Sequence, residues 1–157
     1  MRPALPGHAG KILRDRWLAG FLSLLVLLVS GANCWAQTFP QLTGRVVDAA
    51  NIIPQDETVR LDQKLAGLEQ QSHRQLVVVT LPDLQGYDVS DYGYQLGRAW
   101  GIGSKEHNDG ALLIIAPKER KVRIEVGYGL EPVLTDGLSS LIVRQVILPR
   151  FKAGDMP

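Results

Sequence analysis

Apolar residues recur along this chain at two different spacings, one typical of helices and the other typical of strands. After Pro54, a residue suited to the first turn of a helix, Leu61, Leu65 and Leu68 follow one another at i, i+4 and i+7. This spacing predicts an amphipathic helix that runs to about Gln71 and buries one stripe of leucines.

The same spacing predicts two further helices. The first begins at Asp88 or Ser90, either of which can cap it, and stops at Gly101-Ile102-Gly103; its inner positions are Val89, Tyr92, Leu96 and Trp100. The second is capped by Thr135 and ends at Pro149; its apolar positions are Leu138, Leu141, Ile142 and Val146.

Three stretches have the composition of strands. Residues 75–81 and 111–116 are almost entirely apolar, as strands buried on both faces are, whereas residues 121–127 alternate between apolar and charged side chains. The turn at 117–120 is too short for a crossover, so the last two strands are predicted to pair as an antiparallel hairpin. Together the elements predict an α/β fold, a three-layer α/β/α sandwich with a mixed sheet.

The N-terminal 36 residues have the pattern of a secretory signal peptide. Basic residues precede an apolar run at 17–31, and Cys34-Trp35-Ala36 offers small residues at the usual cleavage spacing. Cleavage after Ala36 would leave residues 37–157 as one exported domain. An uncleaved anchor is the alternative, although the apolar run is short for a membrane span.

Removal of residues 1–36 changes the chemistry that the chain can perform. The single cysteine is lost, so the exported domain has no disulfide partner and no thiol nucleophile. The 17 basic and 16 acidic side chains fall by four and one, to 13 and 15, which makes the net charge −2. Such a balance gives no electrostatic reason to expect nucleic acid as a partner.

The hairpin brings acidic residues together that are distant in the sequence. Its first strand starts beside the end of its second, so Asp109 should lie near Gly129, with Glu131 and Asp136 just beyond. Loop carboxylates with nearby carbonyl groups are the ligands that Ca²⁺ and Mg²⁺ prefer, and a metal site is therefore predicted here. The structural alternative is local: Asp109 as a turn residue, and Asp136 as an acid in the first turn of a helix.

The same region offers candidate phosphate-binding groups. Gly127 and Gly129 do not belong to a dinucleotide motif, because the third glycine of that motif would fall at Pro132. They allow the backbone to approach a ligand, or simply a sharp exit from the strand. Arg123 could bind phosphate oxygens or form an ion pair with Glu125 on the same strand face.

No catalytic residue is predicted. His107 adjoins the acidic turn and could act as a general acid, but its position in a polar loop favours a solvated histidine. The serines lie in no recognisable nucleophile motif.

Several segments in this order and spacing resemble the TPM domain family, from about Phe39 to Asp155. The segments are Val47-Asp48 with Ile53-Pro54, then QLVVVTL, Trp100–Gly103, NDGALLIIA, KVRIEVGYGLEPVLTD and ILPRFKAGD. The resemblance implies a Rossmann-like sandwich on the extracytoplasmic side of a bacterial membrane, in the periplasm. It also adds Asp48 to the candidate metal ligands. Whether Asp48 reaches the same sheet edge depends on the strand order.

The resemblance implies two functions of different classes. Some family members bind calcium and act on membrane protein complexes, which favours an exported divalent-metal-binding module in the assembly or maintenance of such complexes. Others are acid phosphatases, so a metal-assisted phosphatase is the alternative. Relatives normally continue into another helix after the position of Asp155, which this sequence lacks; either the sequence is a fragment, or one sheet face is left uncovered.

Overall fold

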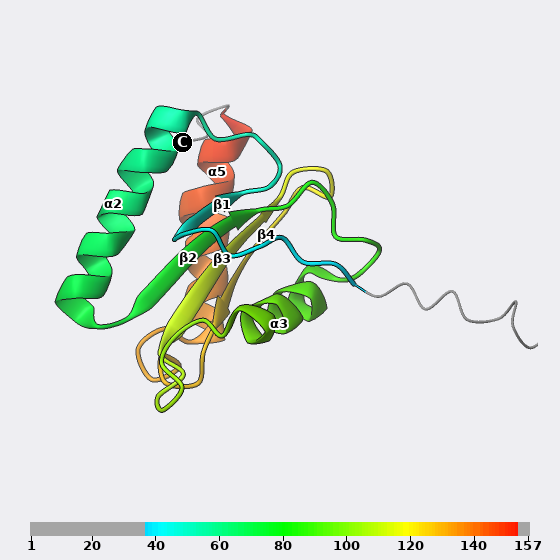
Figure 1. Ribbon diagram of the computed structural model, residues 1–157. Helices are drawn as coiled ribbons and strands as arrows, with labels where there is room; N and C mark the ends of the chain where they lie inside the picture. The colour runs from blue at the N-terminus through cyan, green and yellow to red at the C-terminus, as the bar shows by residue number, and fades with distance from the viewer. Residues whose placement is uncertain (1–36, 154–157) are drawn as a thin grey trace, which may run out of the picture. The chain divides into compact units, whose positions relative to one another are not determined.

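The computed structural model describes residues 37–153, in which four strands form one sheet in the order β1-β2-β3-β4. Strands β1 (Val46–Asp48), β2 (Gln75–Thr80) and β3 (Gly110–Ala116) are parallel, and β4 (Lys121–Val126) runs antiparallel to β3 (Figure 1). The predicted hairpin is confirmed. Strand β1 was not predicted, because three residues are too few to show a period of two.

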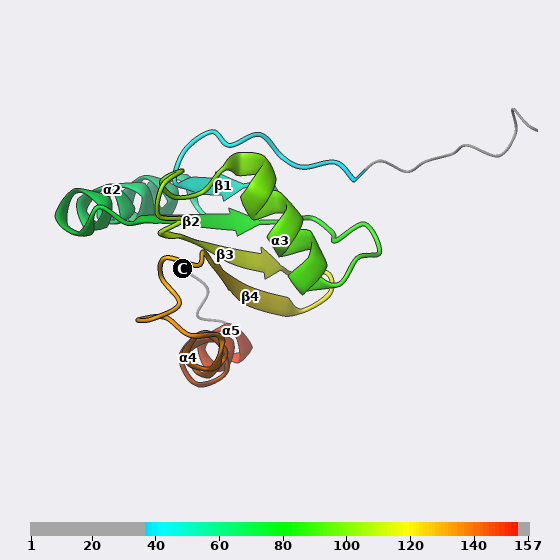
Figure 2. The same ribbon diagram turned by 90° about the horizontal axis from the view of Figure 1, so that it is seen from below.

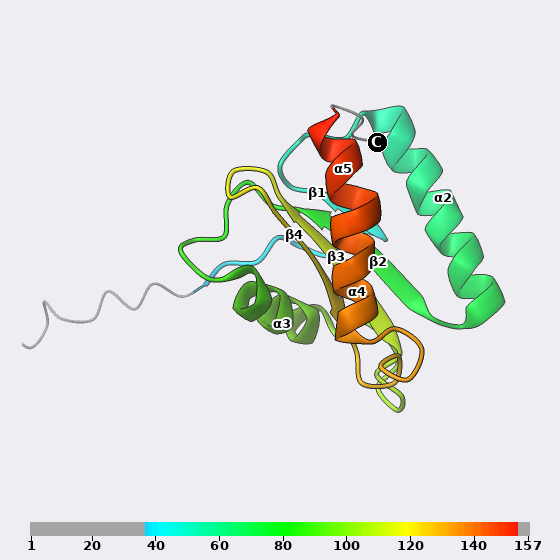
Figure 3. The same ribbon diagram turned by 180° about the vertical axis from the view of Figure 1, so that it is seen from behind.

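Helices cover both faces of the sheet and make the predicted α/β/α sandwich. Helix α3 (Val89–Trp100) lies on one face. Helix α2 (Gln55–Ser72) lies on the other, together with a continuous helical rod (Figures 2 and 3). The rod consists of α4 (Asp136–Ile142), the π-helix η1 (Val143–Ile147) and α5 (Leu148–Lys152).

Alternate side chains of β2 pack against the helices on opposite faces of the sheet. Val77 and Val79 of β2 pack with Tyr92 and Leu96 of α3, and all four are at most 1% exposed. The residue between the two valines, Val78, packs on the opposite face with the cluster around α2. The apolar strand interior therefore reflects cover on both faces, as its composition predicted.

The two crossover connections have opposite hands. The β1-α2-β2 and β2-α3-β3 units step across the sheet in the same direction, yet α2 and α3 lie on opposite faces. One of the units must therefore be left-handed, although nearly all such units are right-handed. The arrangement lets a short sheet with no reversal of strand order be covered on both faces.

The structure confirms the predicted N-terminal caps of α3 and α4. Asp88 Oδ1 accepts from the N–H of Ser90 at 2.9 Å, so Asp88 is the cap of α3. Thr135 caps α4, and its Oγ1 accepts from the N–H of Leu138 at 3.2 Å. Each cap satisfies one of the N–H groups that the first turn of a helix leaves without a partner.

The prediction that Pro149 ends the last helix is wrong. The chain passes through η1 and continues as α5, in which Pro149 occupies the first turn, the one place where a helix does not need the missing N–H. The predicted apolar positions of this helix are also largely outside the core: Leu138 is 41% and Leu141 43% exposed, and the helix buries Ser139 instead.

The segment that follows the predicted cleavage site is held against α3. The carbonyl oxygen of Thr38 accepts from the Tyr92 hydroxyl at 3.0 Å, and that of Pro40 accepts from the Trp100 indole at 2.9 Å. The predicted signal peptide, residues 1–36, and the last four residues lie outside the described part. Within that part, no helix combines the length and the apolar character needed to cross a membrane.

Candidate functional site

The β3–β4 ladder continues past the end of β4 and brings the acidic turn beside the glycine segment. The N–H of Gly127 donates to the Gly110 carbonyl at 2.8 Å, and the N–H of Gly129 donates to the Asn108 carbonyl at 3.1 Å. The turn that contains Asp109 therefore adjoins Gly129 and the loop that follows it.

Glycine is required at both of these positions because the two backbones are in direct contact. A Cβ atom on Gly127 would lie 2.1 Å from the Asn108 oxygen, and one on Gly129 would lie 2.0 Å from the His107 oxygen. The space and the N–H groups that a phosphate would need are thus already used by residues 107–110. These glycines close the hairpin end.

A cleft of about 550 Å³ lies beside this junction, between α3 with its following loop and β4 with its following loop. Its volume is within the range of ligand-binding clefts. Ionisable and aromatic side chains from five segments line it: Tyr94, Arg98, Lys105, Arg123, Glu125, Tyr128, Glu131 and Asp136.

Two carboxylates in this cleft are available to a ligand. Glu131 and Asp136 are exposed, and within residues 37–153 neither side chain has a hydrogen-bond or ion-pair partner. Asp136 stands in the first turn of α4, directly after the cap Thr135, where the helix dipole also favours a negative charge. No group of three acidic, histidine or cysteine side chains with metal-site geometry occurs in the described residues.

The other charged side chains of the cleft are mostly paired. Arg123 Nε lies 2.6 Å from Glu125 Oε2, so the predicted ion pair is present and its charges offset each other. The Arg98 guanidinium donates to the Tyr94 hydroxyl at 2.8 Å and lies over the same ring. Lys105 is the remaining cation of the lining.

Asp109 holds its own loop together and does not line the cleft. Its Oδ1 accepts from the Ser104 N–H at 2.9 Å and from the Ser104 hydroxyl at 2.8 Å. These hydrogen bonds, first that of the backbone N–H and then that of the hydroxyl, lower the pKa of Asp109.

Ser104 also lies near His107, with 3.3 Å between Oγ and Nδ1. No motif in the sequence indicates this contact. The arrangement is not that of a catalytic triad, because the carboxylate accepts from the serine and does not orient the histidine.

Asp48 lies at the opposite end of the parallel strands from this cleft. It ends β1 and pairs with Thr80, whereas the cleft adjoins the row of Gly110 and Gln75, five residues earlier on β2. At the rise of a strand, the two rows are about 16 Å apart. Asp48 and the cleft acids therefore cannot ligate one ion.

Local groups occupy the Asp48 carboxylate. It accepts from the N–H groups of Ile52 at 3.1 Å and Ile53 at 2.9 Å, and from the hydroxyl of Thr80, which is fully buried. Burial by itself would raise the pKa of Asp48, but the hydrogen bonds from Thr80 and from the backbone outweigh it and lower that pKa.

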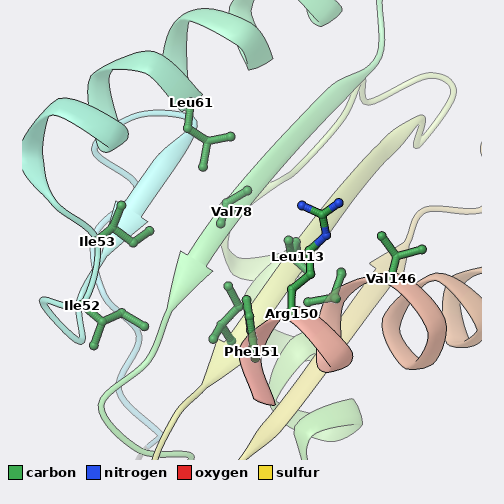
Figure 4. A pocket seen from close by; sticks show the side chains of 10 residues that line it. Ile52, Ile53, Leu61, Val78, Leu113, Val146, Arg150 and Phe151 are labelled. Carbon is green, nitrogen blue, oxygen red and sulfur yellow. The ribbon is translucent and has the colours of Figure 1, made fainter. Parts of the chain in front are cut away.

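A second cavity, of about 480 Å³, lies on the opposite face of the sheet, between α2 and the rod of α4, η1 and α5 (Figure 4). Val78 and Leu113 of the sheet line it, with Leu61 on one side and Phe151 on the other. Among the described residues, Arg150 is the charged member of the lining, which includes no acid or histidine from this part of the chain.

Comparisons with known proteins point to one family. A family model described as the TPM domain matches residues 46–157. The N-terminal domain of a protein from P. gingivalis, solved by solution NMR, is 34% identical with a TM-score of 0.66, over 72% of each chain. An N-terminal domain from Corynebacterium glutamicum is 19% identical over 60% of each chain, with a TM-score of 0.48. The search of curated proteins found no match.

Proposed function

The chain belongs to the TPM domain family, and on that premise we propose that it is an exported module that binds a divalent cation in the cleft between α3 and β4. Glu131 and Asp136 would be the protein ligands, and Ca²⁺ is the preferred ion. The observation that supports this proposal is that two carboxylates line one cleft and have no partner within the described part of the chain.

The number of protein ligands implies weak binding. Ca²⁺ takes six to eight oxygen ligands, whereas two carboxylates supply at most four, and water or carbonyl groups must complete the shell. Mg²⁺ is disfavoured because it demands a near-ideal octahedral site and gives up its water reluctantly. We therefore expect a dissociation constant of about 0.1–1 mM, the range of extracellular calcium modules.

An incomplete ligand shell also suits a role between two molecules. A carboxylate or phosphate of a partner can occupy the open positions of the ion, so that the cation joins the domain to the partner. Tyr94, 49% exposed, and Tyr128, 74% exposed, stand in the lining of the cleft, and tyrosine is enriched at protein interfaces. We propose a membrane protein complex on the extracytoplasmic side as that partner, an assignment that rests on family membership.

A calcium titration followed by NMR tests the cation site. Amide shifts should concentrate at residues 128–137 and saturate in the millimolar range. Glu131→Gln and Asp136→Asn should each weaken binding about tenfold or more, because each removes one of two anionic ligands.

Asp56→Asn is the matched control, since Asp56 is likewise an acid in the first turn of a helix but lies on α2, outside the cleft. Its calcium affinity should equal that of the unmodified protein. Shifts spread evenly over the surface, or equal losses in all three variants, would refute the site.

A metal-assisted phosphatase is the second candidate function. The observation in its favour is that two cations, Lys105 and Arg98, line the same cleft as the two free carboxylates, so a phosphate could lie beside a bound ion. Hydrolysis of a phosphomonoester that needs added metal and is lost in Glu131→Gln would support it. Calcium binding without any turnover would refute the phosphatase and support the binding module.

A further inference from the structure

Strand β4 is an open edge of the sheet. Hydrogen-bonded pairs alternate along an antiparallel ladder, and the bond from Gly127 to Gly110 fixes which residues of β4 face β3. The backbone N–H and C=O groups of Val122, Ile124 and Val126 therefore point away from β3. Within the described residues, none of these outward groups has a hydrogen-bond partner.

The edge strand is also only half covered. Six of the seven residues of β3 are buried, but no residue of β4 is, although helices lie on both faces of the sheet. The strand carries neither a proline nor a bulge, which are common ways of blocking an edge. An edge of this kind is a template for another strand.

We propose that β4 pairs antiparallel with β4 of a second copy of this chain, about a two-fold axis at Ile124. This is the register in which the outward groups of both strands meet: Ile124 faces Ile124 of the second copy, and Val122 faces Val126. Six backbone hydrogen bonds would then join the two sheets into one of eight strands.

Charge complementarity selects a second copy as the occupant. In this register Arg123 of one copy stands opposite Glu125 of the other, and the symmetry axis repeats the pair. Both side chains lie on the α3 face, because their partners on β3 belong to that core. The Arg123–Glu125 pair within each chain would become a ring of four alternating charges, whose cross-strand pairs lie at the shorter Cα separation of about 4.5 Å.

Hydrogen exchange on the natural protein, purified as its cell produces it, tests the pairing. At high protein concentration the amides of Val122, Ile124 and Val126 should be protected, and they should exchange rapidly when the protein is diluted into the monomer. The amides of Arg123 and Glu125 should be protected at both concentrations, because they bond to β3. Sedimentation over the same range should show a monomer–dimer equilibrium.

Charge variants test the register. Arg123→Glu and Glu125→Arg each place like charges opposite one another at two symmetric positions, so each should raise the dimer dissociation constant about tenfold or more. The double variant R123E/E125R restores complementarity and should restore the dimer.

Three results would overturn the proposal: a monomer at all concentrations up to about 1 mM, a dimer in which the three outward amides exchange freely, or a double variant no better than the singles. None of these readouts depends on bound calcium, so the pairing and the cation site can fail separately.

Discussion

The hydrogen bonds of Asp48 predict that its carboxylate stabilises the fold and is not a metal ligand. Replacement by alanine leaves three donors without their acceptor: the N–H groups of Ile52 and Ile53 and the buried hydroxyl of Thr80. A hydrogen bond to a charged group contributes about 1.5–3 kcal/mol. Because Asp48 is only half buried, water replaces part of this, and we expect Asp48→Ala to lower the free energy of unfolding by about 2–4 kcal/mol.

Urea denaturation at pH 7, followed by circular dichroism, measures this loss. The slope of the transition should stay unchanged while its midpoint falls, the sign of a change in stability alone. Asp48→Asn keeps one carbonyl oxygen and should lose about half as much. Asp56→Ala, at an exposed acid outside the core, should lose less than about 1 kcal/mol.

The same carboxylate makes stability depend on pH. Its pKa in the folded protein lies below the ordinary value of 3.8, so its contribution is fully present above that value and is lost as pH falls through the lower, folded-state pKa. The unmodified protein should therefore lose stability below about pH 4 more steeply than Asp48→Asn does. A loss below about 1 kcal/mol in Asp48→Ala at pH 7, or a calcium affinity that falls in that variant, would refute the structural role.

Three further predictions concern the hairpin end and its surroundings. Gly129→Ala should destabilise the protein by about 2–4 kcal/mol, since its Cβ would lie 2.0 Å from the His107 oxygen. Gly67→Ala, in the interior of α2 with nothing within 4 Å of the new Cβ, should stabilise the protein by about 0.5–1 kcal/mol. Equal effects of the two substitutions in urea denaturation would contradict the close approach at Gly129. Thr135→Ala should cost about 1 kcal/mol by loss of the α4 cap, and Thr135→Ser, which keeps the acceptor, should restore most of it. Asp109→Asn should lower the protection factor of the Ser104 amide, which is its exchange rate corrected for the intrinsic effect of pH, and lowering the pH through the depressed pKa of Asp109 should lower the same protection factor in the unmodified protein; an unchanged protection factor would refute the loop bond.

The elements with strong periodicity could be predicted from the sequence, and those fixed by contacts could not. The burial of β2, β3 and α3 follows their apolar patterns in the sequence, and the alternation of β4 was sufficient to predict a strand, although none of its residues is fully buried. The three-residue β1 has no period of its own and exists because its backbone pairs with β2. The helix continues past Pro149 by way of η1, a π-helix that no pattern in the sequence predicts.

The candidate site shows the same division. The tight turn between β3 and β4 was sufficient to predict that Asp109 lies near Gly129, because register follows from turn length, and the structure places the neighbouring Asn108 directly beside Gly129. The direction of each side chain was not predictable. Ser104, five residues before Asp109, donates to the Asp109 carboxylate, and the Asp48 carboxylate accepts from the backbone of Ile52 and Ile53, which precede α2. Of the predicted ligands, Glu131 and Asp136 line the cleft and have no such partner among residues 37–153.

The strand order explains why the cleft lies where it does. In open parallel sheets, ligands bind beyond the carboxyl ends of the strands, at the point where the order of the strands reverses and two loops separate. The order β1-β2-β3-β4 never reverses, and the carboxyl end of β1 is closed by the contact between Asp48 and Thr80. Because β4 is antiparallel to β3, its carboxyl end lies beside the amino end of β3, at the opposite end of the sheet from the carboxyl end of β1. The loop that follows this end of β4 and the loop that follows α3 both line the cleft, so the cleft lies at the amino end of β3.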